Sequence, residues 1–127
     1  MCEAAMRGTA HVACLRNARA AAECLADGHE AVMLLAAASR GEFREEDQLC
    51  CAWIAARLAD NGYEAADART AQLVDRWATA PADALTASRS VAYLADTGQL
   101  RDLEFVLEHV DDLGQAFRMQ AGEVVPA

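Results

Sequence analysis

The chain has no lysine, and it is poor in proline, in aromatic residues and in positive charge. All 11 basic residues are arginine, and 20 Asp and Glu residues give a formal net charge of −9. Nucleic-acid binding needs a basic surface, so this balance argues against direct contact with nucleic acid. The sequence also has no run of about 18 apolar residues, so it predicts no membrane-spanning helix and no membrane partner.

Cysteine is present in an odd number, and the N-terminal residues contain no long apolar stretch of the kind that a signal peptide has. Disulfides belong to oxidising compartments, so we expect a cytoplasmic protein with reduced thiols. Most of the cysteines lie among Ala and Leu, where the side chain behaves as a small buried hydrophobic group. The five are Cys2, Cys14, Cys24, Cys50 and Cys51.

The fold class follows from strong helix formers and regularly spaced breakers. Stretches rich in Ala, Leu, Arg and Glu are separated by Gly or Pro, and alternation of β-branched residues is missing. The sequence therefore predicts a single all-α domain, residues 1–127, with short loops that place consecutive helices in three antiparallel hairpins. The hairpins form either a short repeat array or a closed helical bundle. The six expected helices span residues 3–27, 29–40, 44–60, 63–79, 82–96 and 99–120.

Apolar stripes support these helices. In the last segment apolar residues recur at steps of three and four, which is one buried face of an amphipathic helix. The segment from Glu30 to Ser39 is apolar nearly all round, so we expect it to be the most buried helix. The stripe of the last segment consists of Leu100, Leu103, Val106, Leu107, Val110, Leu113 and Phe117.

A short pattern recurs at three of the expected helix ends. Residues 25–28, 58–62 and 94–98 each read Leu-Ala-Asp followed by Gly, either at once or after one residue. Gly readily adopts the left-handed conformation that ends helices. Helical hairpins with a period of this length are typical of an α-helical repeat array, although an Ala-rich chain produces such a pattern by chance as well.

One stretch resembles a degenerate tetratricopeptide repeat, and it spans residues 48–81. The resemblance implies a helical groove that binds a segment of another protein. It departs from the pattern in the spacing between Gly and Ala in the turn and in the late position of the Pro. The residues that carry it are Trp53, Leu58, Asn61, Gly62, Tyr63, Ala66 and Pro81. Residues 20–43 show a second similarity, to the helical-hairpin chaperones of type III secretion needle subunits.

No catalytic signature is present in the sequence. His11 and Cys14 share a helix face and could form a zinc site with His29, Cys50 or Cys51, but a second local pair of ligands is missing. No phosphate-binding Gly-rich loop, dinucleotide fingerprint or nucleophile turn occurs. We therefore expect a protein that is not an enzyme and that has neither a metal nor a cofactor.

The sequence favours a non-enzymatic module, an adaptor or chaperone that binds a client segment in a helical groove. In such an array the first helix of each hairpin lines the concave surface. Arg57, Arg89 and Tyr93 are therefore candidate partner-binding residues. A short array leaves apolar edges exposed, so a homodimer is one way in which the chain could cover them.

Two other functions stay open. In the first, an acidic inhibitor, of the immunity type or encoded by a phage, blocks a basic, nucleic-acid-binding protein. Its contact residues are Glu104, Glu108 and Asp111, on the acidic side of the last expected helix. In the second, a thiol or metal sensor uses Cys50, Cys51 and His11.

Overall fold

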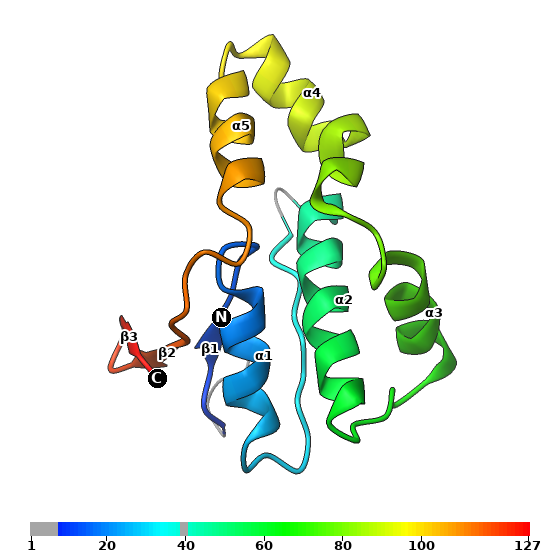
Figure 1. The fold of residues 1–127 in the computed structure, drawn as a ribbon, viewed down its shortest axis with the longest axis vertical. Helices are drawn as coiled ribbons and strands as arrows, with labels where there is room; N and C mark the ends of the chain where they lie inside the picture. Colours follow the sequence, from blue (N-terminus) through cyan, green and yellow to red (C-terminus); the bar gives the residue numbers. More distant parts are fainter. Residues whose placement is uncertain (1–7, 39–40) are drawn as a thin grey trace.

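The structure, a computed structural model, describes residues 8–38 and 41–127 (Figure 1). Within these residues the fold is mostly helical, with six helices and a small three-stranded sheet, so it is not purely all-α. The helices are α1 (Ala18–Ala26), α2 (Glu45–Asp60), α3 (Ala68–Trp77), the 3-10 helix η2 (Ala82–Ala87), α4 (Arg89–Asp96) and α5 (Leu100–Glu108). The strands are β1 (His11–Val12), β2 (Phe117–Gln120) and β3 (Glu123–Pro126).

The first expected helix, residues 3–27, is wrong over much of its length. Residues 3–7 lie outside the described residues, and β1 occupies His11–Val12. Asn17 ends this stretch, because its side chain accepts a hydrogen bond from the backbone N–H of Cys14 at 2.8 Å. Only α1 is helical, and Asn17 directly precedes it.

The expected helix at residues 29–40 does not form. Residues 31–38 are extended, and residues 39 and 40 lie outside the described part. A short run that is apolar on all sides fits a buried strand as well as a buried helix, and periodicity alone does not separate the two. In the structure, burial alternates along the run with a period of two, as in a strand.

The expected helix at residues 44–60 is confirmed as α2. Glu45, Glu46 and Asp47 lie in its first turn and Arg57 in its last, an arrangement that the helix dipole favours. Asn61 follows, and its side-chain amide donates a hydrogen bond to the carbonyl oxygen of Arg57 at 2.8 Å. Acidic residues thus mark the beginning of the helix and a basic residue marks its end, which explains why the boundaries of α2 were predictable.

The next two expected helices, residues 63–79 and 82–96, are shorter than expected. Asp67 caps α3, because its carboxylate accepts a hydrogen bond from the backbone N–H of Thr70 at 2.7 Å. The second segment divides at Ser88, whose hydroxyl accepts a hydrogen bond from the backbone N–H of Val91. η2 lies before this cap and α4 after it. Helices α3 and α4 therefore begin at a side-chain cap rather than at the preceding Gly or Pro.

The last expected helix, residues 99–120, ends at Glu108. Beyond it the chain docks on the start of α1, where Asp111 and Leu113 donate backbone hydrogen bonds to the carbonyl oxygens of Leu15 and Arg16. Strands β2 and β3 then form an antiparallel hairpin. Its two turn residues, Ala121 and Gly122, have φ values of 51° and 85°, as a tight two-residue hairpin turn requires. Strand β1 pairs with β2, so the order in the sheet is β1-β2-β3.

The chain does not form three antiparallel hairpins. The extended segment of residues 31–38 carries the chain back between α1 and α2, so the two helices run in the same direction (Figure 1). Two extended stretches, one through β1 and one at 31–38, each lead into a helix. This succession of strand, helix, strand and helix is that of parallel α/β units.

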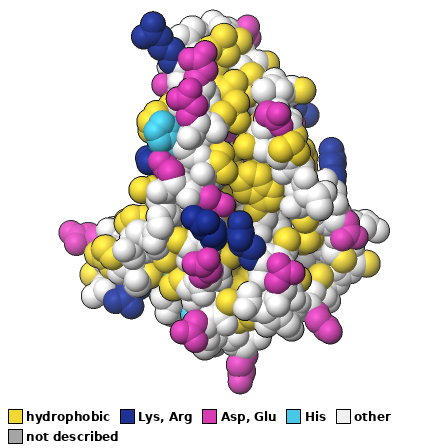
Figure 2. Space-filling view, in the orientation of Figure 1, with side chains coloured by type: hydrophobic (Ala, Val, Ile, Leu, Met, Phe, Trp, Pro, Cys, Tyr) yellow, Lys and Arg dark blue, Asp and Glu magenta, His cyan; other side chains and the backbone are white. Residues whose placement is uncertain are grey.

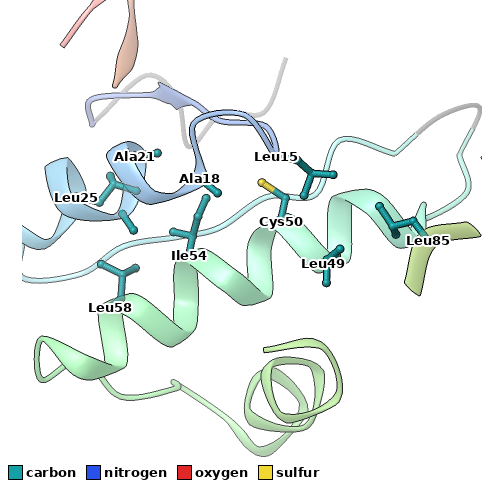
Figure 3. Packing of buried hydrophobic residues seen from close by; sticks show 10 residues of the cluster. Leu15, Ala18, Ala21, Leu25, Leu49, Cys50, Ile54, Leu58 and Leu85 are labelled. Carbon is teal, nitrogen blue, oxygen red and sulfur yellow. The ribbon is translucent and has the colours of Figure 1, made fainter. Parts of the chain in front are cut away.

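The buried core lies between α1 and α2. Small residues of α1 allow close approach, since Ala18, Ala21 and Ala22 are almost completely buried. In Figure 3, Ala18 of α1 lies opposite Ile54 of α2. Val32 and Leu34 of the extended segment pack against the same cluster. The remaining members of the buried cluster are Leu15, Leu25, Leu49, Cys50, Ile54, Leu58 and Leu85.

Candidate functional site

A cavity of about 750 Å³ opens beside the extended segment, and its size is typical of a small-molecule site. All seven residues from Ala31 to Ala37 line it, together with parts of α2, α4 and α5. Most of the lining is apolar. The described polar and ionisable side chains that line it are Thr9, His11, Cys14, Arg16, His29, Glu46, Asp47, Cys50, Cys51, Ser88 and Ser90.

Two neighbouring carboxylates of α2, those of Glu46 and Asp47, reach this cavity. The helix places them where the extended segment ends, at the beginning of α2 (Figure 1). One oxygen of each, Oε2 of Glu46 and Oδ2 of Asp47, is buried without a hydrogen-bond partner. The other oxygen of Glu46 accepts a hydrogen bond from the Ser90 hydroxyl of α4. A buried carboxylate oxygen without a partner is costly, so this pair is suited to a ligand that supplies positive charge or protons.

The surroundings of Asp47 oppose its ionisation. Burial raises the pKa of the Asp47 carboxyl above its usual value, and the negative charge of Glu46 raises this pKa further. Arg44 acts in the opposite direction and does not cancel the shift. Asp47 therefore retains a proton to higher pH than a solvated Asp, unless a cation approaches it.

Two cysteines of the cavity, Cys50 and Cys51, are not activated nucleophiles. Burial raises the pKa of the Cys50 thiol to about 12, and the nearby Cys51 and Cys14 contribute to the same shift. Burial also raises the pKa of Cys51, followed by the effect of Asp47. Because the thiolate is the reactive form, neither thiol has the lowered pKa that covalent cysteine catalysis needs.

Two histidines lie where the extended segment begins. The rings of His11 and His29 meet edge to face with centroids 6.0 Å apart. Burial lowers the pKa of His11, and the charges of His29 and Arg118 lower it further, so the imidazole is neutral at pH 7. An extended chain rises about 3.3 Å per residue, so Ala31 and Ala37 are separated by roughly 20 Å. A small substrate bound at Glu46 and Asp47 would not reach these histidines.

Ion pairs fix the loop after α5 against α1. Arg16, which lines the cavity, binds Asp112 through two hydrogen bonds of 2.8 Å each. Asp111 accepts a hydrogen bond from the backbone N–H of Arg19 at 2.8 Å. This Arg16–Asp112 pair lies at the surface and holds a guanidinium at the edge of the cavity.

Three of the residues expected to bind a partner, Arg57, Arg89 and Asp111, take part in ion pairs within the chain. Arg57 and Asp111 come together, with 3.5 Å between the Arg57 Nη2 and Asp111 Oδ2 atoms. Arg89 instead pairs with Glu42 at 3.1 Å, and both side chains are exposed. Tyr93 on α4 is exposed, as are Glu104 and Glu108 on α5. Their role in partner binding stays a prediction.

The expected metal ligands are close to one cavity but are not gathered at one point. His11, Cys14, His29, Cys50 and Cys51 all line it. Within the part of the chain that the structure describes, no group of three or more His, Cys, Asp and Glu side chains could hold a metal ion.

No catalytic role was assigned to Glu46 and Asp47 from the sequence, because an acidic cluster in the first turn of a helix is explained by a solvated face and by the helix dipole, or by a surface that binds a basic partner. The signal available in the sequence was the apolar run at residues 31–38 just before them. If that run is a buried strand, the acids that follow lie at its carboxyl end, where α/β proteins bind ligands.

Comparison with known proteins gives one match. The sequence model of a family described as 2-phosphosulpholactate phosphatase matches residues 3–113, which is most of the chain. No curated protein and no solved structure matches. The resemblance to a tetratricopeptide repeat over residues 48–81 is therefore wrong. The match also overturns the expectation of a non-enzymatic adaptor, chaperone or inhibitor, because this family is a family of phosphatases.

The membrane prediction was tested on the described helices only. None of them combines the length and the apolar character that crossing a bilayer requires. The compartment in which the protein acts stays a prediction.

Proposed function

Because the chain belongs to the 2-phosphosulpholactate phosphatase family, we propose that it takes part in the hydrolysis of a phosphate monoester of a small sulphonated hydroxy acid. The substrate named by the family is a lactate that carries a sulphonate and, on the 2-hydroxyl, a phosphate. In its hydrolysis the oxygen of a water molecule bonds to phosphorus and the ester P–O bond breaks. The 2-oxygen receives a proton, and the products are the hydroxy acid and inorganic phosphate.

The observation that carries the location of this chemistry is that Glu46 and Asp47 both line the cavity and each has one buried carboxylate oxygen without a hydrogen-bond partner. Glu45 also has such an oxygen but does not line this cavity. Such a substrate carries phosphate, sulphonate and carboxylate groups, all of them negative. Two carboxylates alone would repel it, so the pair needs a positive charge between itself and the phosphate. Mg²⁺ is typically held by one or two carboxylates together with phosphate oxygens of the substrate.

Glu46 and Asp47 therefore fit a hard divalent cation, which would neutralise charge on the phosphate when it is bound. The ionisation of Asp47 is disfavoured by burial and by the charge of Glu46, and a cation would relieve both effects. Ser90 positions Glu46 by donating a hydrogen bond to one of its oxygens, which leaves the other oxygen free. Arg16 also lines the cavity, but its guanidinium is already bound to Asp112 through two hydrogen bonds, so it supplies little unpaired charge for the substrate.

The first prediction tests this function through phosphate release from 2-phosphosulpholactate, measured with Mg²⁺ and with a chelator. Asp47→Asn and Glu46→Gln should each lower kcat/KM by about a hundredfold or more, the typical effect of removing an electrostatic group from a reaction centre. Glu45→Gln is the matched control. Glu45 lies in the same helical turn but does not line the cavity, so its removal should change kcat/KM by less than about twofold.

Binding of the cation is measured separately, without substrate. Mg²⁺ should raise the Tm of the wild-type protein and of Glu45→Gln, and should leave the Tm of Asp47→Asn unchanged. Equal loss of activity in Asp47→Asn and Glu45→Gln, or no release of phosphate by the wild-type protein, would refute the proposed site.

A further inference from the structure

Two histidines and an arginine lie close together where the extended segment begins, at the other end of the cavity from Glu46 and Asp47. His11 and His29 both line the cavity, and their ring centroids are 6.0 Å apart. Arg118 of β2 lies directly opposite His11 of β1. Residues that are directly opposite in an antiparallel pair project to the same face of the sheet, so the guanidinium and the imidazole are neighbours.

The ring of His11 lacks hydrogen-bond partners. Both of its nitrogens are buried, and neither has a partner. One nitrogen carries a hydrogen in the neutral ring, and both do in the charged ring, so at least one buried donor has no acceptor. The backbone of Phe117 raises the pKa of His11, but this effect is smaller than the opposite effects of burial, His29 and Arg118. A ligand that accepts hydrogen bonds would satisfy this ring.

The ring of His29 is held in a defined orientation. Its Nδ1 atom lies 3.1 Å from the carbonyl oxygen of Leu25, and because that oxygen can only accept, Nδ1 carries the hydrogen. The hydroxyl of Tyr63 donates a hydrogen bond to the carbonyl oxygen of His29. Nε2 therefore has a lone pair in the neutral ring and becomes a second donor when the ring gains a proton.

No carboxylate balances this cluster. Three other arginines each pair with an Asp or Glu, whereas Arg118 forms no ion pair among the described residues and donates to the amide oxygen of Gln120 at 3.2 Å. The charged groups that act on His11 are His29 and Arg118, and both oppose its protonation. The chain has a net charge of −9, and acidic side chains are spread over the face that Figure 2 shows. A positive cluster without an acid is therefore suited to a negative ligand.

We propose that His11, His29 and Arg118 form a binding site for a small oxyanion, a phosphate or sulphonate group, separate from the carboxylates of Glu46 and Asp47. The anion would accept hydrogen bonds from the ring of His11 and from the guanidinium, and it would stabilise the charged form of both rings. A metal cation fits less well, because the guanidinium repels it and no carboxylate attracts it. The extended segment separates the two ends of the cavity by roughly 20 Å, so one small ligand does not span them.

The second prediction measures the pKa of each histidine by NMR, with and without methanesulphonate and in the absence of divalent cations. Methanesulphonate stays ionised throughout the titration, so a change in its binding comes from the protein. At saturation it should raise the pKa of His11 and of His29 by about 1 each, which by linkage equals about tenfold tighter binding when the ring is charged. His109 is the internal control, because it stacks on Phe105 and does not line the cavity. Its pKa should stay the same.

Two arginine variants test whether the cluster itself binds the anion. Arg118→Gln should raise the Kd for methanesulphonate by about tenfold, the usual effect of losing a hydrogen bond to a charged group. Arg69→Gln removes the same charge from α3, none of whose residues lines the cavity, and should change this Kd by less than about twofold. Both variants should keep the circular dichroism of the wild-type protein.

Inorganic phosphate is the second probe and identifies the group that the site prefers. A lower Kd for phosphate would assign the site to a phosphate group, and a lower Kd for methanesulphonate would assign it to a sulphonate group. Either result supports an oxyanion site. The proposal is overturned if neither anion raises the pKa of His11 and His29, if sodium chloride at the same ionic strength has the same effect, or if Arg118→Gln and Arg69→Gln weaken binding equally. Because these measurements use neither substrate nor Mg²⁺, their failure would leave the proposed phosphatase site untouched.

Discussion

Helices α1 and α2 form one region of the molecule, and the α4–α5 hairpin forms another of similar composition but different burial. Four residues of α1 and five of α2 are buried. Helices α4 and α5 contain no buried residue, although both are amphipathic, and they extend away from the core in Figure 1. An apolar stripe thus identifies a helix, but it does not show that other residues of the chain bury that stripe.

The third prediction concerns the free energy of unfolding, for which the difference between the α1–α2 core and the α4–α5 hairpin should be largest. Leu49 of α2 is fully buried, and Leu100 of α5 is 46% exposed. Leu49→Ala should lower the free energy of unfolding by about 3 kcal/mol, because it removes buried methyl groups and leaves a cavity. Leu100→Ala should change it by about 0.5 kcal/mol or less.

Urea denaturation measures both free energies, provided that the dependence on urea concentration keeps the same slope in the two variants. Equal losses in Leu49→Ala and Leu100→Ala would show that the α4–α5 hairpin is as well covered as the core. The two variants are compared at one protein concentration.

The same contrast explains which parts of the fold were predictable from the sequence. Helix α2 was predicted almost to the residue, since its apolar stripe, terminal charges and Asn61 all agree. The extended structure of the segment within residues 29–40 was not predicted, because an apolar run carries no periodicity that separates a strand from a helix.

The site was less predictable than the fold. Arg57 and Asp111 were both selected, for different surfaces, yet the loop after α5 brings them together. Glu46 and Asp47 were interpreted as an ordinary acidic helix start. Their lack of hydrogen-bond partners depends on the packing of the extended segment and of α4 around them, which no local pattern in the sequence specifies.

The fourth prediction tests how far a helix outside the core depends on its own ends. The carboxylate of Asp67 caps α3, a helix that contains no buried residue. Asp67→Ala should cost about 1 kcal/mol of stability, the usual effect of losing an N-cap. Asp67→Asn keeps an acceptor and should stay within a few tenths of a kcal/mol of the wild-type protein. A loss in Asp67→Asn as large as in Asp67→Ala would assign the effect to charge and not to capping.

The fifth prediction uses pH to test the half-buried acid of the cavity, Asp47. The folded protein raises the pKa of Asp47 above its value in the unfolded chain, mainly through burial. As pH rises from below the unfolded value through the folded one, the unfolded state loses its proton first, so the wild-type protein loses stability over this range. Asp47→Asn cannot ionise and should avoid that loss, so its stability relative to the wild-type protein should increase from acid to neutral pH in the absence of divalent cations. Denaturation of Asp47→Asn and of the wild-type protein at several pH values measures this difference. Parallel profiles for the two proteins would mean that Asp47 is as well solvated as a surface carboxylate, which would remove the electrostatic reason for a cation at this end of the cavity.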